Sequence, residues 1–257
     1  MEGMQESIRG KGEKMFQVEK NKYSNSEQLQ AWKKTTPARI GISHVGARYT
    51  TSAYLSFLRD HAAANDAVFQ EVPDEVVKKL GVFEVQTLCN NKQEMLKRPD
   101  LGRLFSEETK SFLKKHCKHN VDVQIYFGDG LCAPSIEANV PDLYAAIEAE
   151  LKSQNISVGT PFFVRYCRVN TARIIAPLLG AKVTCVLIGE RPGLLTSESM
   201  SAYIAYNARM DMSESEYTVV SNISRVGTPP VEAAAHIAEL LTDILQKKCS
   251  GVKYSVL

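Results

Sequence analysis

The sequence predicts an α/β protein in which a parallel, Rossmann-like sheet is covered by helices. Two observations support this prediction. Apolar strand-like runs alternate with segments of helical periodicity between Ser106 and Cys249. Neighbouring parallel strands also need a crossover connection, which a helix usually supplies. The length of 257 residues accommodates such a core with a smaller lobe beside it.

The strands of this core are expected where short runs rich in β-branched and aromatic residues occur. These runs cover residues 121–127, 162–169, 183–189 and 217–223. A further short strand is expected earlier in the chain, at residues 39–42.

Helical segments separate the strands. The segment 106–118 begins with Ser106 as a possible N-cap, and the two glutamates that follow suit the positive end of the helix dipole. In the closing helix, Thr228 can cap the first turn and Pro229 fits within it. One face of that helix is traced by Val231, Ala234, Ala238, Leu241 and Leu245. Further helices are predicted at residues 51–70, 142–154, 171–179 and 197–206.

The chain is predicted to have three parts. In residues 1–37 basic residues outnumber acidic ones, and the apolar residues are spaced too irregularly for an amphipathic helix. We therefore expect a basic N-terminal extension there. Residues 38–104 are predicted to form a helical or mixed lobe, and residues 105–257 the α/β core.

Composition argues against several classes of function. A formal net charge of +2 gives no large field of one sign, so neither nucleic acid nor an anionic membrane is the expected partner. No apolar run approaches the ~20 residues of a membrane-spanning helix. The first residues lack the apolar stretch of a secretory signal, which predicts an intracellular protein. The six cysteines form no C-x-x-C pair, so we expect reduced thiols.

Ligands of open α/β sheets bind where the loops after the strands converge. Four such loops are Gly128-Asp129-Gly130, Arg168-Val169-Asn170, Gly189-Glu190-Arg191-Pro192-Gly193 and Ser221-Asn222-Ile223. Asp129 either contacts a ligand or belongs to a tight turn. Glu190 and Arg191 either contact a ligand or form an internal ion pair that closes the end of the sheet.

The familiar catalytic and nucleotide-binding motifs do not occur. The sequence has neither a G-x-G-x-x-G nor a G-x-x-x-x-G-K-[ST] pattern, and Ser43 lacks the final glycine of a nucleophile elbow. His116, Cys117 and His119 form a possible metal-ligand cluster, but they lie at the lysine-rich end of a predicted helix, which favours a solvated helix end. The sequence therefore predicts no metal site and no catalytic residue.

A set of five motifs in a fixed order carries a family resemblance. They are Arg98-Pro99-Asp100-Leu101-Gly102-Arg103, Gly159-Thr160-Pro161-Phe162-Phe163-Val164-Arg165-Tyr166 with Arg168-Val169, Leu187-Ile188-Gly189-Glu190-Arg191-Pro192-Gly193-Leu194, Ser221-Asn222-Ile223, and Gly227-Thr228-Pro229-Pro230-Val231-Glu232-Ala233-Ala234-Ala235. From about Ala38 to the end, the chain resembles the small (light) subunit of ethanolamine ammonia-lyase.

The resemblance implies a lyase that converts ethanolamine to acetaldehyde and ammonia by a radical mechanism. It implies adenosylcobalamin as the cofactor, held between this chain and a large barrel-shaped subunit that carries the substrate site. The cofactor supplies the radical chemistry, and the protein supplies binding, orientation and exclusion of water. The resemblance also implies a cytoplasmic location inside a bacterial microcompartment, for which residues 1–37 are a candidate targeting segment.

The resemblance places cofactor contacts at Val169, Glu190 and Val219. Members of the family often carry cysteine at the third position, so any contact of Val219 is expected to be apolar or through the backbone. Arg168 and Asn222 are neighbours that we include in the predicted binding set. The sequence has no D-x-H-x-x-G motif, so we expect the nucleotide base of the cofactor to stay on cobalt.

Two other functions remain open at this point. The chain is either a coenzyme-binding subunit that is inert alone, or a self-sufficient hydrolase or transferase with Asp129 and Glu190 as acid and base, or an adaptor whose loops bind only protein. Dependence on cobalamin and on the large subunit separates these three.

Overall fold

The computed structural model describes residues 27–256, and the chain divides into two compact units, Met1–His61 and Ala62–Leu257. Of the N-terminal extension predicted at residues 1–37, residues 1–26 lie outside the described part of the chain. The boundaries proposed at 37/38 and 104/105 stay predictions. No helix of the described part is long and apolar enough to cross a membrane.

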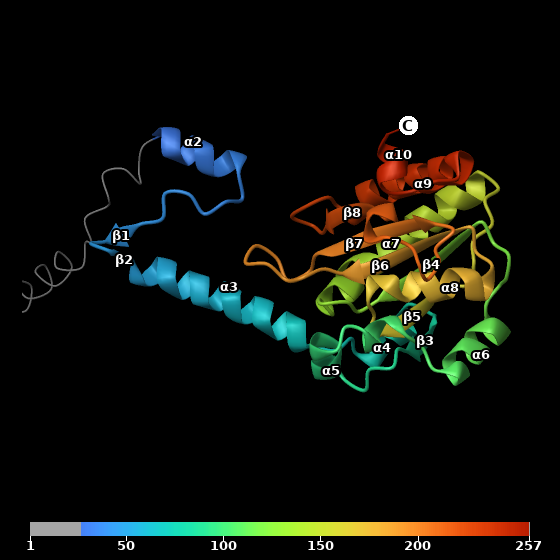
Figure 1. Cartoon of the computed structure of the whole chain (residues 1–257). Coiled ribbons are helices and arrows are strands. Elements are labelled where there is room, and N and C mark those ends of the chain that lie inside the picture. Colours follow the sequence, from blue (N-terminus) through green and yellow to red (C-terminus); the bar gives the residue numbers. More distant parts are fainter. Residues whose placement is uncertain (1–26, 257) are drawn as a thin grey trace, which may run out of the picture. The chain divides into compact units, whose positions relative to one another are not determined.

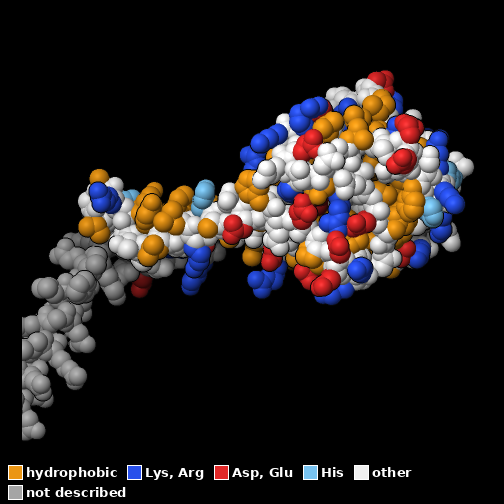
Figure 2. Space-filling view, turned by 90° about the horizontal axis from the view of Figure 1, so that it is seen from below, with side chains coloured by type: hydrophobic (Ala, Val, Ile, Leu, Met, Phe, Trp, Pro, Cys, Tyr) orange, Lys and Arg blue, Asp and Glu red, His pale blue; other side chains and the backbone are white. Residues whose placement is uncertain are grey.

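The first unit holds helix α2 (Glu27–Thr35), a hairpin of β1 (His44–Val45) and β2 (Arg48–Tyr49), and the start of helix α3 (Thr51–Phe69). The strand expected at residues 39–42 is wrong. Strands β1 and β2 pair just beyond this segment. In the turn between them, Gly46 adopts the positive φ of 61° that a two-residue hairpin turn requires. None of residues 27–61 is buried, and apolar and basic side chains lie on the surface of this unit (Figure 2).

The second unit is built on a six-stranded sheet with the order β3-β5-β4-β6-β7-β8 (Figure 1). The first four of these strands are parallel neighbours, whereas β7 pairs antiparallel with both β6 and β8. The α/β class is thus confirmed, but the sheet is mixed rather than parallel throughout, because β7 runs antiparallel to its neighbours. The strands are β3 (Phe83–Gln86), β4 (Val123–Gly128), β5 (Phe162–Arg165), β6 (Val183–Gly189), β7 (Met200–Tyr206) and β8 (Thr218–Ile223).

Helices cover both faces of this sheet. Helices α7 (Pro134–Ser153) and α9 (Pro230–Lys247) pack on one face, against side chains such as Ile125 and Leu187. Helices α6 (Glu107–His116) and α8 (Ala172–Leu179) pack on the other, against Tyr126 and Val186. The alternation of side chains along β4 and β6 explains why both faces are apolar. Shorter helices are α4 (Asp74–Lys79), α5 (Lys92–Lys97) and α10 (Val252–Ser255), with 3₁₀ turns η3 (Leu101–Arg103), η4 (Val169–Thr171) and η5 (Glu214–Glu216).

The N-cap predicted for α6 is confirmed, whereas the one predicted for α9 is wrong. Ser106 does cap α6, because its hydroxyl accepts a hydrogen bond from the Thr109 amide at 3.1 Å. Thr228 does not cap α9: Pro229 occupies the N-cap position without a side-chain bond, and the first turn begins at Pro230. On the predicted face of α9, Val231 is exposed, whereas Ala234, Ala238 and Leu241 are buried.

The helix predicted at residues 197–206 is wrong, since Met200–Tyr206 forms strand β7. This segment is flanked by strands on both sides, and the pairing with β6 and β8 outweighs the helical preference of its alanines. Helix α7 begins at Pro134, earlier than the predicted 142, and continues through Pro141. A proline within a helix removes a backbone donor, which is why the sequence favoured a later start.

Candidate functional site

The predicted loops converge at one edge of the sheet. Strands β4, β5 and β6 are parallel and end there at Gly128, Arg165 and Gly189. Strand β8 runs in the same direction as β6, because β7 pairs antiparallel with both, so it also ends at this edge. We call this edge the rim. The reversal of β7 leaves the predicted meeting of the loops intact.

A pocket of about 200 Å³ opens at the rim. Three of the predicted residues, Arg168, Val169 and Glu190, line it. The remaining lining residues come from the loops after β4, β5 and β6 and from strand β7: Gly130, Leu131, Cys167, Ile188, Gly189, Arg191 and Tyr203. The structure thus brings together Arg168 and Glu190, which are more than 20 positions apart, as expected if the loops after the strands converge.

Val219 and Asn222 do not line the pocket but lie beside it. Val219 is directly opposite Tyr203 in the β7–β8 ladder, so both side chains lie on the same face of the sheet. Val219 is 44% exposed, which leaves an apolar surface next to the pocket. Asn222 is joined to the pocket through its backbone amide, which donates to Glu190.

The carboxylate of Glu190 accepts hydrogen bonds from three donors, and we call this cluster the Glu190 junction (Glu190, Ser199, Ser201, Asn222). The Ser199 hydroxyl donates to Oε2 at 2.6 Å. Oε1 accepts from the Asn222 amide at 2.8 Å and from the hydroxyl of Ser201. Both serines are buried. The junction ties the loop after β6 to the start of β7 and the end of β8.

A second carboxylate lies at the end of β4, and we call its cluster the Asp129 junction (Lys92, Asp129, Gly130, Cys167). The side chains of Lys92 and Asp129 are only 4% and 3% exposed, and their charged groups are 3.4 Å apart. The Lys92 ammonium also donates to the Gly130 carbonyl at 2.8 Å, and the Cys167 amide donates to Asp129 at 2.8 Å. The junction fixes the loops after β4 and β5 against helix α5.

Glycines allow the loops after β4 and β6 to approach each other closely. Gly130 has a φ of 53°, and a Cβ on it would lie 2.2 Å from the Gly189 carbonyl oxygen. The Leu131 amide donates to that same carbonyl at 3.0 Å. Any side chain at position 130 would therefore push the two loops apart.

Two arginines supply positive charge at the pocket. Burial and the neighbouring Arg103 lower the pKa of Arg168, whose guanidinium donates to the Met95 carbonyl at 3.0 Å. Arg191 is exposed and forms no ion pair within residues 27–256. The internal Glu190–Arg191 pair that the sequence left open is therefore not the arrangement observed; Glu190 is held by neutral donors instead.

The other side of the pocket is apolar and aromatic. Val169 packs against the core beneath α8, together with Tyr203. Burial, with Glu190 and Glu214 nearby, raises the pKa of Tyr203, which keeps its hydroxyl neutral. The pocket thus combines a fixed acceptor, exposed positive charge and apolar side chains.

The chain is similar to known proteins of one family. Residues 26–254 match the family model described as the ethanolamine ammonia-lyase light chain. The ethanolamine ammonia-lyase small subunit of Clostridium tetani is 50% identical over 228 residues, which cover 89% of this chain and 77% of the relative. The chain belongs to the ethanolamine ammonia-lyase light chain family.

Other small subunits are similarly close. The small subunit of Clostridium perfringens is 50% identical over 229 residues, or 89% of this chain and 78% of the relative. The small subunit of Fusobacterium nucleatum is 48% identical over 234 residues, or 91% of this chain and 79% of the relative. The family resemblance stated from the five motifs is confirmed.

Sequence reasoning missed several residues at the rim of this light chain, one of which lines the pocket and three of which belong to the two junctions. Ser199, Ser201 and Tyr203 lie in the segment predicted as a helix, so their meeting with Glu190 was not foreseen. Lys92 belongs to a segment with no motif, and nothing in its surroundings marks it as buried. A correct strand assignment for residues 200–206 would have placed Ser201 opposite Ile188 at the end of β6, whereas Ser199 lies just before that strand.

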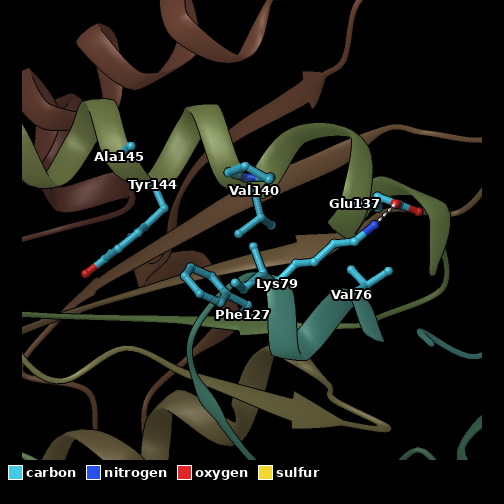
Figure 3. A pocket seen from close by; sticks show the side chains of 9 residues that line it. Val76, Lys79, Phe127, Glu137, Val140, Tyr144 and Ala145 are labelled. Carbon is cyan, nitrogen blue, oxygen red and sulfur yellow. Dashed lines mark ion pairs between the residues drawn. The ribbon is translucent and has the colours of Figure 1, made fainter. Parts of the chain in front are cut away.

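The light chain has a further hollow on its surface, between α4 and α7. Its volume is about 300 Å³, and Val76, Phe127, Val140 and Tyr144 line it (Figure 3). An ion pair of 3.7 Å between Lys79 and Glu137 closes one side. None of the predicted site residues lies there.

The histidine and cysteine cluster at the end of α6 bonds to its own helix. His116 pairs with the Phe112 carbonyl and His119 with the Lys114 carbonyl. Burial raises the pKa of Cys117 to about 11, which disfavours the thiolate that a metal needs. Among residues 27–256 there is no group of three side chains suited to hold a metal ion.

Proposed function

We propose that this chain is the small subunit of an adenosylcobalamin-dependent ethanolamine ammonia-lyase and holds the corrinoid at the rim, against a large subunit that carries the substrate site. The observation that carries the proposal is the pocket at the rim, where Arg168, Val169 and Glu190 meet. Membership of the family adds the reaction: the relatives are named as small subunits of ethanolamine ammonia-lyase.

The residues present fit one edge of a corrinoid. A corrin macrocycle is far larger than about 200 Å³, so the pocket takes a peripheral substituent while the ring lies over the rim. Gly130 and Gly189 both line the pocket, and their close approach holds the loops after β4 and β6 together there. Val169, Tyr203 and Val219 supply apolar contact, and Glu190 supplies a hydrogen-bond acceptor.

When bound, adenosylcobalamin supplies the radical chemistry that converts ethanolamine to acetaldehyde and ammonia. The role of this chain is to bind and orient the corrinoid. Glu190 accepts a hydrogen bond from a peripheral amide, while Val169 and Val219 exclude water from the edge of the ring. The two junctions keep these groups in place before the cofactor arrives, which lowers the entropy lost on binding.

The competing reading of Asp129 and Glu190 as an acid–base pair has less support. Asp129 is buried and engaged by Lys92 and the Cys167 amide, so it has no surface for a substrate. Glu190 is held by three internal donors. A group that transfers protons in catalysis needs access to the reacting atoms, and this arrangement favours binding over catalysis.

The test is co-expression with a large subunit of the same family, followed by an assay of acetaldehyde formed from ethanolamine. We expect activity only with both subunits and with adenosylcobalamin. Cobalamin titration of the small subunit alone and of the complex, followed by the absorbance of the corrin, gives a second measurement. Activity of this chain alone, or a complex indifferent to cobalamin, would contradict the proposal.

For the location of the protein, we propose the cytoplasm and, within it, a bacterial microcompartment, with residues 1–37 as the targeting segment. Fusion of these residues to a fluorescent protein in cells that form such compartments tests this proposal. A diffuse signal from the fusion, with the full-length chain confined to the compartments, would refute it.

A further inference from the structure

The carboxylate of Glu190 has one remaining acceptor position. A carboxylate offers about four lone-pair sites. Three of these accept from Ser199, Ser201 and the Asn222 amide. Since Glu190 also lines the pocket, the remaining site is the one available to a ligand.

The surroundings of Glu190 fix its role as an acceptor. All three internal partners donate to the carboxylate, and a carboxylate has no hydrogen of its own to donate, so a ligand bound to it must supply a donor. The backbone amide of Glu190 is itself bonded to the Ser199 carbonyl at 3.0 Å, which restrains the main chain. The carboxylate is thus held at both its backbone and its oxygens.

Within residues 27–256, Glu190 belongs to no ion pair, whereas Asp129 is paired with Lys92. An unneutralised carboxylate attracts a neutral N–H donor and repels a second carboxylate. Corrinoids carry acetamide and propionamide side chains around the ring, and hydrolysis of one amide places a negative charge at the same position.

We propose that Glu190 selects an amide over a carboxylic acid at one position of the corrinoid periphery, and that Ser199 and Ser201 are positioning residues for this selection. The inference rests on the proposed function and deepens it by naming the ligand chemistry. The two hydroxyls hold the carboxylate so that it meets the amide N–H; without them the side chain turns away and the distinction between amide and acid weakens.

Two arginines line the same pocket and act in the opposite direction. Arg191 is exposed and Arg168 is partly buried, and both attract a carboxylate. Their charges attract a carboxylate near the pocket, so only the group that directly contacts Glu190 is expected to be preferred as an amide. The proposal predicts a preference at one position of the ring rather than a general preference for uncharged corrinoids.

The experiment is equilibrium binding of cyanocobalamin and of its separated monocarboxylic acids, each with one propionamide converted to a carboxylate, to the complex of this chain with the large subunit. For the wild-type complex we expect one acid to bind at least about tenfold more weakly than cyanocobalamin. In Glu190→Gln the charge is lost, so the ratio for that acid falls to about one. In Ser199→Ala/Ser201→Ala the ratio falls part of the way.

Matched controls come from the same loop. Glu198→Gln makes the same charge change at an exposed residue that does not line the pocket, and Ser197→Ala removes a neighbouring hydroxyl. Both are expected to keep the wild-type ratio. If every acid binds the wild-type complex within twofold of cyanocobalamin, or if Glu190→Gln keeps the ratio, the inference is overturned while the proposed function stands. A wild-type complex that does not bind cyanocobalamin overturns both.

Discussion

Asp129 and Glu190 are both carboxylates at the ends of neighbouring strands, but the protein treats them differently. Asp129 is sealed beneath the rim and neutralised by Lys92. Glu190 lies at the pocket, and its partners among residues 27–256 are two hydroxyls and a backbone amide. Burying a charge is costly unless it is paired, so the ion pair belongs where water is excluded. A carboxylate without an ion-pair partner is suited to accept a hydrogen bond from a ligand.

The largest effect is expected from breaking the ion pair of the Asp129 junction. Lys92→Met leaves a buried carboxylate without its cation, and we expect the free energy of unfolding to fall by about 3–5 kcal/mol. Denaturant unfolding measures this change. In Lys92→Met/Asp129→Asn no uncompensated charge remains, so part of the loss is expected to return. A loss below about 1 kcal/mol in the single variant would show that the pair is not important for stability.

The second largest effect is expected where the loops after β4 and β6 approach each other, at Gly130 and Gly189. Gly130→Ala places a side chain on a left-handed backbone, which costs about 1–2 kcal/mol, and forces it against the Gly189 carbonyl. We expect lower stability together with weaker corrinoid binding. Gly193→Ala is the control, because its Cβ meets no atom within 4 Å. Equal behaviour of the two variants in thermal unfolding would remove the role assigned to Gly130.

The third prediction compares how much the Glu190 junction and the Asp129 junction contribute to the free energy of unfolding. Ser201→Ala removes one donor to a carboxylate that other groups still hold, and we expect about 1.5 kcal/mol of destabilisation. The loss should be clearly smaller than that of Lys92→Met, measured by the same denaturant unfolding. A larger loss would mean that Glu190, too, is primarily a structural carboxylate.

The smallest effect is expected at Asp122, a more exposed carboxylate just before β4. Partial burial raises the pKa of Asp122, but its bonds with Lys182 and Ser157 outweigh burial and lower the pKa to about 2 from the ordinary 3.8. A lowered pKa stabilises the fold above pH 3.8, and this stabilisation is lost as the pH falls towards about 2.

Because solvent screens this pair, we expect Asp122→Asn to cost only about 1 kcal/mol at pH 7. The difference from the wild type should disappear between pH 3.8 and about 2, as urea unfolding at a series of pH values measures. A difference that persists at pH 2 would assign the effect to packing rather than to charge.

How far the sequence predicts this structure depends on whether the signal is local. Strand β6 and helix α8 follow from short apolar runs and helical periodicity, and the Ser106 cap follows from one residue type at one position. The meeting of Val169 and Glu190 follows from the rule that parallel strands end at one edge. These features need no knowledge of distant partners.

Features that depend on distant partners were beyond the sequence. Strand β7 is a strand because β6 and β8 pair with it on both sides, which overrides the helical preference of its alanines. Lys92 is buried because a carboxylate 37 positions away neutralises it. Lysine is almost never fully buried unless paired, so its sequence neighbourhood predicts exposure. Family resemblance supplied Val219, and Asn222 was included as a neighbour; the binding roles of all the predicted site residues stay predictions.

The antiparallel course of β7 also bears on the order in which the rim is built during folding. Two donors reach Glu190 from only 9 and 11 positions along the chain, whereas Lys92 and Cys167 reach Asp129 from 37 and 38 positions on either side. Short loops close at a lower entropic cost, so the meander β6–β7–β8 is expected to assemble early. The hairpin of β7 and β8 would then form in a nascent chain without contacts to β3, the first strand of the six-stranded sheet along the chain.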